Sequence, residues 1–526
     1  MTRIPIKADI GFDEEFHKSI VYFPLVGFVI GLISFLIGTM ILASISTTSF
    51  AASDDGWTEA IQTEAAKNGA WEKWCEKWKI IKDDWTQMSL TPGRTESELN
   101  FGWYSKKGEV PAQIKIGQKA DLSDAKLLTV TTEEAVPGYE SNKAVAKGLK
   151  ANTTYYYSYT KDGKWQEANK YQTRNPYSYS FCFVGDPQIG SSSDNIAIDA
   201  TKKQGQDVAA RNDSFNWANT INTALSLRPN ASFIVSAGDQ IQTIDKTNKD
   251  PMFTGNEIEY AGYLSPEALK GLPVATTIGN HDALSKNYTF HFNNPNITEL
   301  GTTNAGGDYY YSYGDALFIV LNTNSDNIKE HEQLMKKAIA SDSDAKWRIV
   351  TLHQDIYGSG EHSNEPEIAN LRYNLVPIFE ENDVDIVLSG HDHTYSRSFF
   401  LEGAKLYEDT MITDDEFEAY FEGEKLVDDT YTKYLDGIED KAAIKTKAVS
   451  GTVTNPKGIL YLTANSASGS KYYKLVEKQQ AYINIRWQEE VPTFSIIDIT
   501  SDSMTINTYR TDTLEQIEEP LTIVKR

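Results

Sequence analysis

The residues of this chain that could carry chemistry are carboxylate, amide and imidazole side chains that each come shortly after an apolar run. In chain order they are Asp186, Asp239, Asn280, His353, His391 and His393. Oxygen and imidazole ligands of these kinds suit divalent metal ions, and one carboxylate can bridge two ions. His391 and His393 lie two residues apart, so extended backbone projects both imidazoles to the same side. The pattern therefore predicts a two-metal hydrolytic site.

The apolar runs that precede these side chains predict the elements that position them. Short apolar runs that end in glycine or other small residues are typical of buried parallel strands. The runs begin at Phe181, Phe233, Val274, Ile349 and Ile386. Helical patterns over 214–227, 329–340 and 364–381 alternate with them, which indicates an α/β fold. Because ligands bind beyond the carboxyl ends of such strands, we expect all the candidate ligands at one edge of one mostly parallel sheet.

Five sequence blocks carry a resemblance to a known family. They read GDPQ (185–188), SAGDQIQ (236–242), GNHD (279–282), TLHQD (351–355) and SGHDH (389–393). In this order they resemble the calcineurin-like metallophosphoesterase superfamily, over about 179–400 and a closing segment near 458–510. The resemblance implies a four-layer α/β/β/α sandwich and a catalytic domain over 179–526.

The resemblance also implies two ions that share Asp239 as the bridging carboxylate. The implied ligands are Asp186, Asp239 and His393 for one ion, and Asp239, Asn280, His353 and His391 for the other. Gln188 stands where many members carry a His ligand, so its amide oxygen either binds the ion weakly or leaves that position to water. Gln242 stands where purple acid phosphatases carry a Tyr ligand, so we expect a colourless protein. We expect the cofactors to be two divalent ions, with Mn, Zn and Fe left open.

The remaining site predictions concern catalysis and substrate binding. His281 resembles the family's phosphate-contacting histidine, and we expect Asp282 to orient it. His362, nine residues after His353, resembles a substrate-facing histidine of purple acid phosphatases, although an ordinary loop histidine is the alternative. Arg397 and, more weakly, His291 are candidates for the substrate rim.

Composition limits the partners of this chain. Its net charge is −24 and its pI is about 4.8, so we expect no nucleic acid polymer as a partner. Two divalent ions would carry more positive charge than the site's carboxylates and a bridging hydroxide would neutralise. The metal site would therefore stay cationic, which favours a small phosphorylated substrate. The two cysteines, Cys75 and Cys182, provide no disulfide framework. No protein partner is predicted.

The N-terminal segment, 1–52, predicts export. Leu25–Ile45 is free of charged residues and long enough to cross a bilayer. Lys18 precedes it and no Lys or Arg follows before Lys67, so the positive-inside rule places the remainder outside the cytoplasm. An uncleaved membrane anchor and a cleaved signal remain alternatives, and we expect a cell-surface or secreted, bacterial protein.

Three further segments have their own patterns. Residues 53–88 predict a helical segment whose tryptophans are spaced along one stripe, which favours packing over sugar binding. Residues 89–173 predict a fibronectin-III-like sandwich with a tyrosine corner at Tyr155, resembling the N-terminal domain of purple acid phosphatases, and we expect it to act as a spacer. Residues 401–455 form an acidic insertion that is either a solvated flap or a substrate-selecting lid.

Taken with the resemblance, these features predict an exported metal-dependent phosphatase. We expect it to hydrolyse phosphate monoesters by attack of a metal-bridging hydroxide. A phosphodiesterase or nucleotidase is one alternative. A non-catalytic surface-binding protein with a vestigial metal site is the other.

Overall fold

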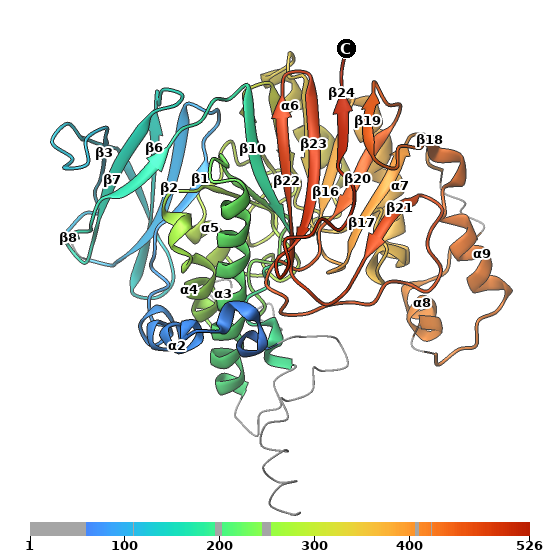
Figure 1. The fold of residues 1–526 in the computed structure, drawn as a ribbon, viewed down its shortest axis with the longest axis horizontal. Coiled ribbons are helices and arrows are strands. Elements are labelled where there is room, and N and C mark those ends of the chain that lie inside the picture. The colour runs from blue at the N-terminus through green and yellow to red at the C-terminus, as the bar shows by residue number, and fades with distance from the viewer. Residues whose placement is uncertain (1–58, 109, 195–201, 245–253, 406–409, 422) are drawn as a thin grey trace, which may run out of the picture. The chain divides into compact units, whose positions relative to one another are not determined.

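The computed structural model describes residues 59–108, 110–194, 202–244, 254–405, 410–421 and 423–526 (Figure 1). The described residues all belong to one compact unit, Ser53–Arg526. The predicted membrane or signal segment, Leu25–Ile45, lies outside the described residues. Among the described residues, none of the helices has the length and apolar character needed to cross a membrane.

The tryptophan-rich segment forms helix α2 (Ala70–Ile81), which packs on helix α3 (Lys202–Leu227). Trp71 is buried, and its ring meets that of Phe215 edge-on at 5.3 Å between centroids. The packing interpretation of the stripe is therefore confirmed. The helix is shorter than predicted, so Trp85 lies beyond its end and packs on aromatic rings of the sandwich instead.

The next segment folds as a β-sandwich of two antiparallel sheets. One sheet has the order β1 (Ser89–Pro92), β2 (Glu98–Lys106), β6 (Tyr139–Lys147), β5 (Val130–Glu134). The other has the order β4 (Lys126–Leu127), β3 (Ile114–Gly117), β7 (Thr154–Lys161), β8 (Lys164–Trp165), with β9 (Asn169–Gln172) paired to β7. Tyr155 Oη accepts the backbone N–H of Lys150 at 2.8 Å, which is the predicted tyrosine corner.

The sandwich is bonded directly to the chain that follows the GNHD block. The hydroxyl of Thr91 donates to the carbonyl of Asn293 at 2.6 Å, and that of Ser141 donates to the carbonyl of Phe290 at 2.8 Å. Ser89 donates in the same way to the carbonyl of His291. The hydroxyls in these contacts are buried, so the sandwich holds this segment in place. The spacer role expected from the sequence is therefore not its whole role.

Two mixed sheets form the centre of the catalytic part. The first has the order β12 (Val274–Thr276), β11 (Ile234–Ser236), β10 (Ser178–Val184), β22 (Thr493–Thr500), β23 (Ser503–Arg510), β24 (Leu521–Val524), β19 (Gly451–Thr454). The second has the order β13 (Tyr309–Tyr313), β14 (Ala316–Val320), β15 (Trp347–Thr351), β16 (Ile386–Ser389), β20 (Ile459–Thr463), β17 (Tyr395–Leu401), β18 (Ile444–Thr446), with β21 (Ile483–Trp487) on β17.

The expectation of a single sheet is therefore wrong. Strands β10, β11 and β12 pair in parallel in the first sheet, whereas β14, β15, β16 and β20 pair in parallel in the second. An apolar run that is buried on both faces has the same composition in either sheet, so the sequence pattern could not separate them.

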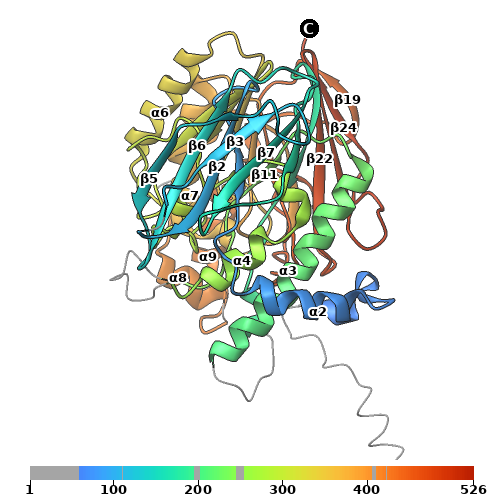
Figure 2. The same ribbon diagram turned by 90° about the vertical axis from the view of Figure 1, so that its left-hand side faces the viewer.

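Helices cover the outer faces of the two sheets, as the four-layer arrangement requires (Figure 2). Side chains of both sheets, among them Phe181 and Phe318, form the apolar core between them. Trp217 of α3 packs on the outside of the first sheet, together with α4 (Glu257–Leu264). On the outside of the second sheet lie α6 (Ile328–Ser341) and α7 (Pro366–Glu381).

The acidic insertion has a small apolar cluster of its own. Its helices, α8 (Asp414–Phe421) and α9 (Asp429–Gly437), pack on α7 through buried Phe417 and Tyr434. Tyr434 Oη also donates to the carbonyl of Asn364 at 2.6 Å, in the turn that begins at His362. The described part of the insertion is thus packed on α7 through a few apolar side chains, while most of its other residues are exposed.

Candidate metal centre

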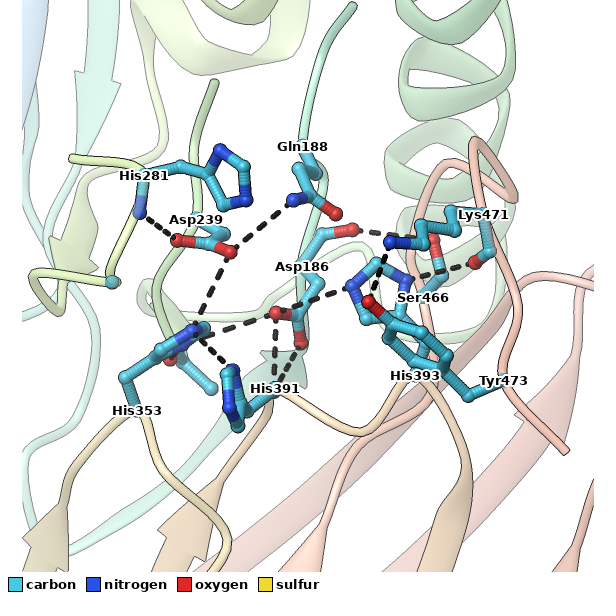
Figure 3. A network of polar contacts seen from close by, with 12 residues as sticks. Asp186, Gln188, Asp239, His281, His353, His391, His393, Ser466, Lys471 and Tyr473 are labelled. Carbon is cyan, nitrogen blue, oxygen red and sulfur yellow. Dashed lines mark hydrogen bonds and ion pairs between the residues drawn. The ribbon is translucent and has the colours of Figure 1, made fainter. Parts of the chain in front are cut away.

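The predicted ligands meet where loops leave the carboxyl ends of β10, β11, β12, β15 and β16 (Figure 3). Asp186, Asp239 and His353 offer ligand atoms that all lie within 4.8 Å of one another. His393 Nε2 lies 3.7 Å from Asp186 Oδ1, and His391 Nδ1 lies 3.2 Å from His353 Nε2. Although the strands belong to two sheets, the loops therefore converge on one cluster.

Asn280 and Gln188 join this cluster. Asn280 Oδ1 lies 2.9 Å from His353 Nε2. Gln188 Nε2 donates to Asp239 Oδ2 at 3.3 Å, which places the Gln188 amide beside the carboxylate predicted to bridge the ions. All seven predicted ligand positions are thus brought together.

The backbone at these positions is conformationally unusual. Asp186, Gln188, Asp239, His391 and His393 all have positive φ, between 35° and 73°. Non-glycine residues rarely adopt this region, and such conformations persist only where surrounding structure enforces them. Two of the enforcing contacts are the backbone N–H of His391 on Asp186 Oδ2 at 2.9 Å and the tight packing of Gly390 against Asp186.

Burial and mutual charge set the protonation of the cluster. Burial raises the pKa of Asp186 well above its ordinary value, opposed by the His353 charge. Burial also disfavours ionised Asp239, but the charges of His353 and His281 hold the pKa of Asp239 below its ordinary value. For His353, burial is outweighed by Asp239, which raises the pKa to about 9.

The two histidines of the His-x-His block behave differently. Burial, with the charge of His353, lowers the pKa of His391 well below its ordinary value. Burial, with the charge of Lys471, lowers the pKa of His393 to about 3. Both imidazoles are therefore neutral at physiological pH, which is the form that binds metals.

The donor set fits divalent metal ions. Gln188 Oε1 is buried and has no hydrogen-bond partner among the described residues, so an acceptor oxygen is left unsatisfied beside Asp239. His391 and His353 direct ring nitrogens toward each other, an arrangement that a shared cation would stabilise. His353 Nδ1 lies 2.9 Å from the carbonyl of Ala237, and this contact fixes the ring so that Nε2 faces the cluster.

His281 lies beside the cluster, but the partner predicted for it is wrong. The backbone N–H of His281 donates to Asp239 Oδ1 at 2.9 Å. Its Nδ1 lies 2.5 Å from the carbonyl of Gln242, and this contact orients the ring. Asp282 is buried and accepts instead from the backbone N–H groups of Gly279 and Gln240, so it stabilises the ligand loops and does not orient His281.

His362 also lies at the cluster. Its ring centroid is 4.6 Å from that of His391. Burial opposes its protonation, but Glu365 Oε1, 2.7 Å from Nδ1, raises the pKa of His362. An imidazole that is oriented by Glu365 and lies beside the cluster is what a phosphate-binding or proton-donating residue requires, whereas an ordinary loop histidine would be solvated.

Arg397 and His291 do not lie at a substrate rim. Arg397 is fully buried, and its guanidinium is bonded to Glu518 and to the carbonyl of Val449. His291 is also buried, with Nε2 2.7 Å from Glu257 Oε2. Both rim predictions are therefore wrong, because the burial of a single polar residue cannot be read from its local sequence.

Two residues that the sequence reasoning missed complete the cluster (Figure 3). The carbonyl of Lys471 lies 2.8 Å from His393 Nδ1, and Lys471 Nζ donates to the hydroxyl of Tyr473 at 2.5 Å. The Tyr473 ring lies 5.2 Å from that of His393 and 4.9 Å from that of His362, between centroids. The one available signal was the apolar run Ile459–Leu462, because β20 ends at the same edge as β16.

The fold and the cluster are compatible with a metal-dependent phosphoesterase, and two family models match the corresponding parts of the chain. Residues 179–395 match the calcineurin-like phosphoesterase family, and residues 85–173 match the purple acid phosphatase N-terminal domain. These parts of the chain are therefore similar to calcineurin-like phosphoesterases and to the purple acid phosphatase N-terminal domain. Residues 1–53 match a third family, cobalamin-5-phosphate synthase.

Particular relatives match over short stretches. Purple acid phosphatase 4 of Arabidopsis thaliana is 44% identical over 52 residues, 10% of this chain and 14% of that protein. Adenosylcobinamide-GDP ribazoletransferase of Clostridioides difficile (strain 630) is 76% identical over 38 residues, 7% of this chain and 15% of that protein. The matches thus span less than a fifth of these relatives' lengths. The structure of purple acid phosphatase PPD1 from yellow lupin superposes with a TM-score of 0.58 at 14% identity, covering 83% of this chain and 74% of that one, which shows a shared fold.

Proposed function

We propose that this protein hydrolyses phosphate monoesters with the help of two divalent metal ions. The observation that carries the proposal is the buried cluster of Asp186, Asp239 and His353, whose ligand atoms lie within 4.8 Å of one another. The residues that would hold the ions are Asp186, Gln188, Asp239, Asn280, His353, His391 and His393. When bound, the ions would supply Lewis acidity and a lowered pKa of water.

The chain's own residues supply the rest of the chemistry. His362, whose pKa Glu365 raises, can bind a phosphate oxygen and, when protonated, donate its proton to the departing alkoxide. Lys471 adds a second cation near the cluster, and the hydroxyl of Tyr473 adds a donor. His281, held by the carbonyl of Gln242, can contact the phosphoryl group as its charge redistributes.

This charge arrangement favours monoesters over diesters. A monoester carries up to two negative charges and a diester carries one. A site that is cationic when two ions are bound, with Lys471 nearby, therefore attracts a monoester more strongly. The phosphodiesterase alternative is thereby less favoured, whereas a nucleotidase, whose substrates are themselves phosphate monoesters, stays compatible with this site.

The test compares two substrates of the purified full chain loaded with Mn²⁺, Zn²⁺ or Fe²⁺. We expect turnover of p-nitrophenyl phosphate to exceed that of bis-p-nitrophenyl phosphate. Asp239→Asn should abolish both, and the exposed variant Glu267→Gln serves as the control. No turnover with any metal would support the non-catalytic alternative, and a preference for the diester would overturn monoester specificity.

The N-terminal match favours one further candidate substrate. Residues 1–53 resemble a protein named for synthesis of cobalamin 5-phosphate, which is itself a phosphate monoester. We propose including this ester in the substrate panel. If its kcat/KM does not exceed that of p-nitrophenyl phosphate, the candidate is rejected.

We also propose that the catalytic part lies outside the cytoplasm, on the basis of the uncharged segment Leu25–Ile45 and the placement of Lys18. Protease added to intact cells should degrade the catalytic part. Full protection in cells with an accessible outer face would contradict export.

A further inference from the structure

A cleft adjoins the metal cluster on the side of Asn280. It has a volume of about 810 Å³, which is enough for a small-molecule ligand. Its walls are the loops that follow β12, β14 and β15 and the exposed face of α7. Asn280 is shared between the two sites, because it lines the cleft while its Oδ1 lies 2.9 Å from His353 Nε2. A group bonded to a phosphate at the cluster can therefore extend into the cleft.

The lining is unusually rich in amides. The amide side chains that line the cleft are Asn280, Asn304, Asn324, Gln354, Asn370 and Asn374. Amides both donate and accept hydrogen bonds, which is what recognition of hydroxyl groups requires.

Some of these amides are held in fixed orientations. Gln354 follows the ligand His353 and is buried, with Oε1 bonded to the hydroxyl of Thr323. Its Nε2 donates to Asn324 Oδ1 at 3.2 Å, and Asn324 Nδ2 donates to the carbonyl of Ile278 at 2.9 Å. The wall nearest the metal cluster is thus organised before any ligand arrives.

On the opposite wall of the cleft, two amide side chains are exposed to solvent. Asn370 and Asn374 are exposed one turn apart on α7. Asn374 Nδ2 donates to the carbonyl of Asn370 at 2.8 Å, which orients the Asn374 amide.

Charge in the cleft excludes anionic groups. Among the described residues that line it, none is Lys, Arg or His, whereas Asp326 and Glu367 are both present and exposed. A leaving group that carries further phosphates would meet these carboxylates without a compensating cation.

We infer that this cleft is the leaving-group subsite and that the substrate is the phosphate monoester of a neutral polyhydroxylated alcohol, such as a sugar. The inference rests on the proposed phosphatase function and adds to it the class of alcohol released. Asn374 and Asn370 are assigned as residues that determine specificity.

The test measures kcat/KM of the metal-loaded full chain for glucose 6-phosphate, β-glycerophosphate, phenyl phosphate and pyrophosphate. Asn374→Leu should lower the ratio of sugar phosphate to phenyl phosphate about three- to tenfold, the effect of losing one hydrogen bond. Asn382→Leu is the matched control. Asn382 caps the C-terminus of the same helix, and its Nδ2 donates to the carbonyl of Ile378, four residues back, at 2.7 Å. Asn382 does not line the cleft. An equal ratio in both variants would overturn the inference.

A second arm tests the charge argument. Asp326→Asn combined with Glu367→Gln should raise kcat/KM for pyrophosphate about two- to fivefold, the size expected for exposed charges. An unchanged or lower value would refute the role of these carboxylates. If the wild type hydrolyses phenyl phosphate but none of the polyol phosphates, the subsite inference fails and the phosphatase function stands. If it hydrolyses neither, the proposed function fails as well.

Discussion

The buried carboxylate of Glu259 should make the stability of this protein decrease as pH rises. Glu259 is fully buried in α4, and its oxygens accept from the backbone N–H groups of Gln242 and Thr243 at 3.0 and 2.8 Å. Burial raises the pKa of Glu259 from 4.5 to about 7, although these hydrogen bonds oppose the shift. The folded chain thus retains a proton over a pH range in which the unfolded chain releases it.

This difference in pKa between the folded and the unfolded chain sets the sign and the size of the pH effect on the free energy of unfolding. The stabilisation is complete below pH 4.5 and is lost progressively as pH rises to about 7, because only then does the folded carboxyl ionise. The total loss is about 3 kcal/mol, since each pKa unit corresponds to about 1.36 kcal/mol. For a unit of this size, that free energy corresponds to a change of about 4 °C in melting temperature.

Glu259→Gln removes the titration and isolates this contribution. The melting temperature of the wild type minus that of the variant should fall by about 3 °C between pH 5 and pH 8, because part of the loss occurs below pH 5. The melting temperatures are measured by tryptophan fluorescence at constant metal loading. Glu267→Gln is the control, because Glu267 is 82% exposed beside Lys270 and should leave the pH profile unchanged. A pH-independent difference for Glu259→Gln would refute the reasoning. Because the Gln242 carbonyl orients His281, we also expect this variant to lower kcat.

Three other outcomes test the metal centre. His281→Ala should lower kcat about 10²- to 10⁴-fold, because His281 is assigned to the phosphate. Elemental analysis should find the metal content of this variant unchanged, and loss of metal would show that His281 is a ligand. Asp239→Asn should reduce the stoichiometry from two ions per chain to one or none, and retention of two would exclude a bridging role. The iron-loaded chain should show no strong visible charge-transfer band, because Gln242 replaces the expected Tyr ligand; a band that disappears in Tyr473→Phe would instead identify Tyr473 as a ligand.

The side chains that converge on the cluster could be predicted because each one comes shortly after an apolar run typical of a buried strand. Asp239 after the strand Ile234–Ser236 and His353 after the strand Trp347–Thr351 illustrate this, since the strand fixes where the loop begins. The division of the strands between two sheets could not be predicted, because a uniformly apolar run does not indicate which other strand pairs with it.

The partners of individual polar side chains were much less predictable. Asp282 follows His281 in sequence but bonds to Gln240, and Arg397 pairs with Glu518, which is distant in the chain. Such contacts depend on how loops from separate elements meet. Lys471 and Tyr473 reach the cluster for the same reason, and no local pattern distinguishes them from other residues of a polar loop.

The hydrogen bonds from the β-sandwich to the segment around Phe290 and Asn293 bear on how this architecture can evolve and be dissected. The donors are side-chain hydroxyls of the sandwich, whereas the acceptors are main-chain carbonyls of the catalytic part. These bonds therefore constrain side-chain identity in the sandwich but not at the acceptor positions. An excised catalytic module would expose Phe290, which is buried in the intact chain, to water. The two modules should thus be inherited together, because deletion of the sandwich uncovers apolar surface of the catalytic part.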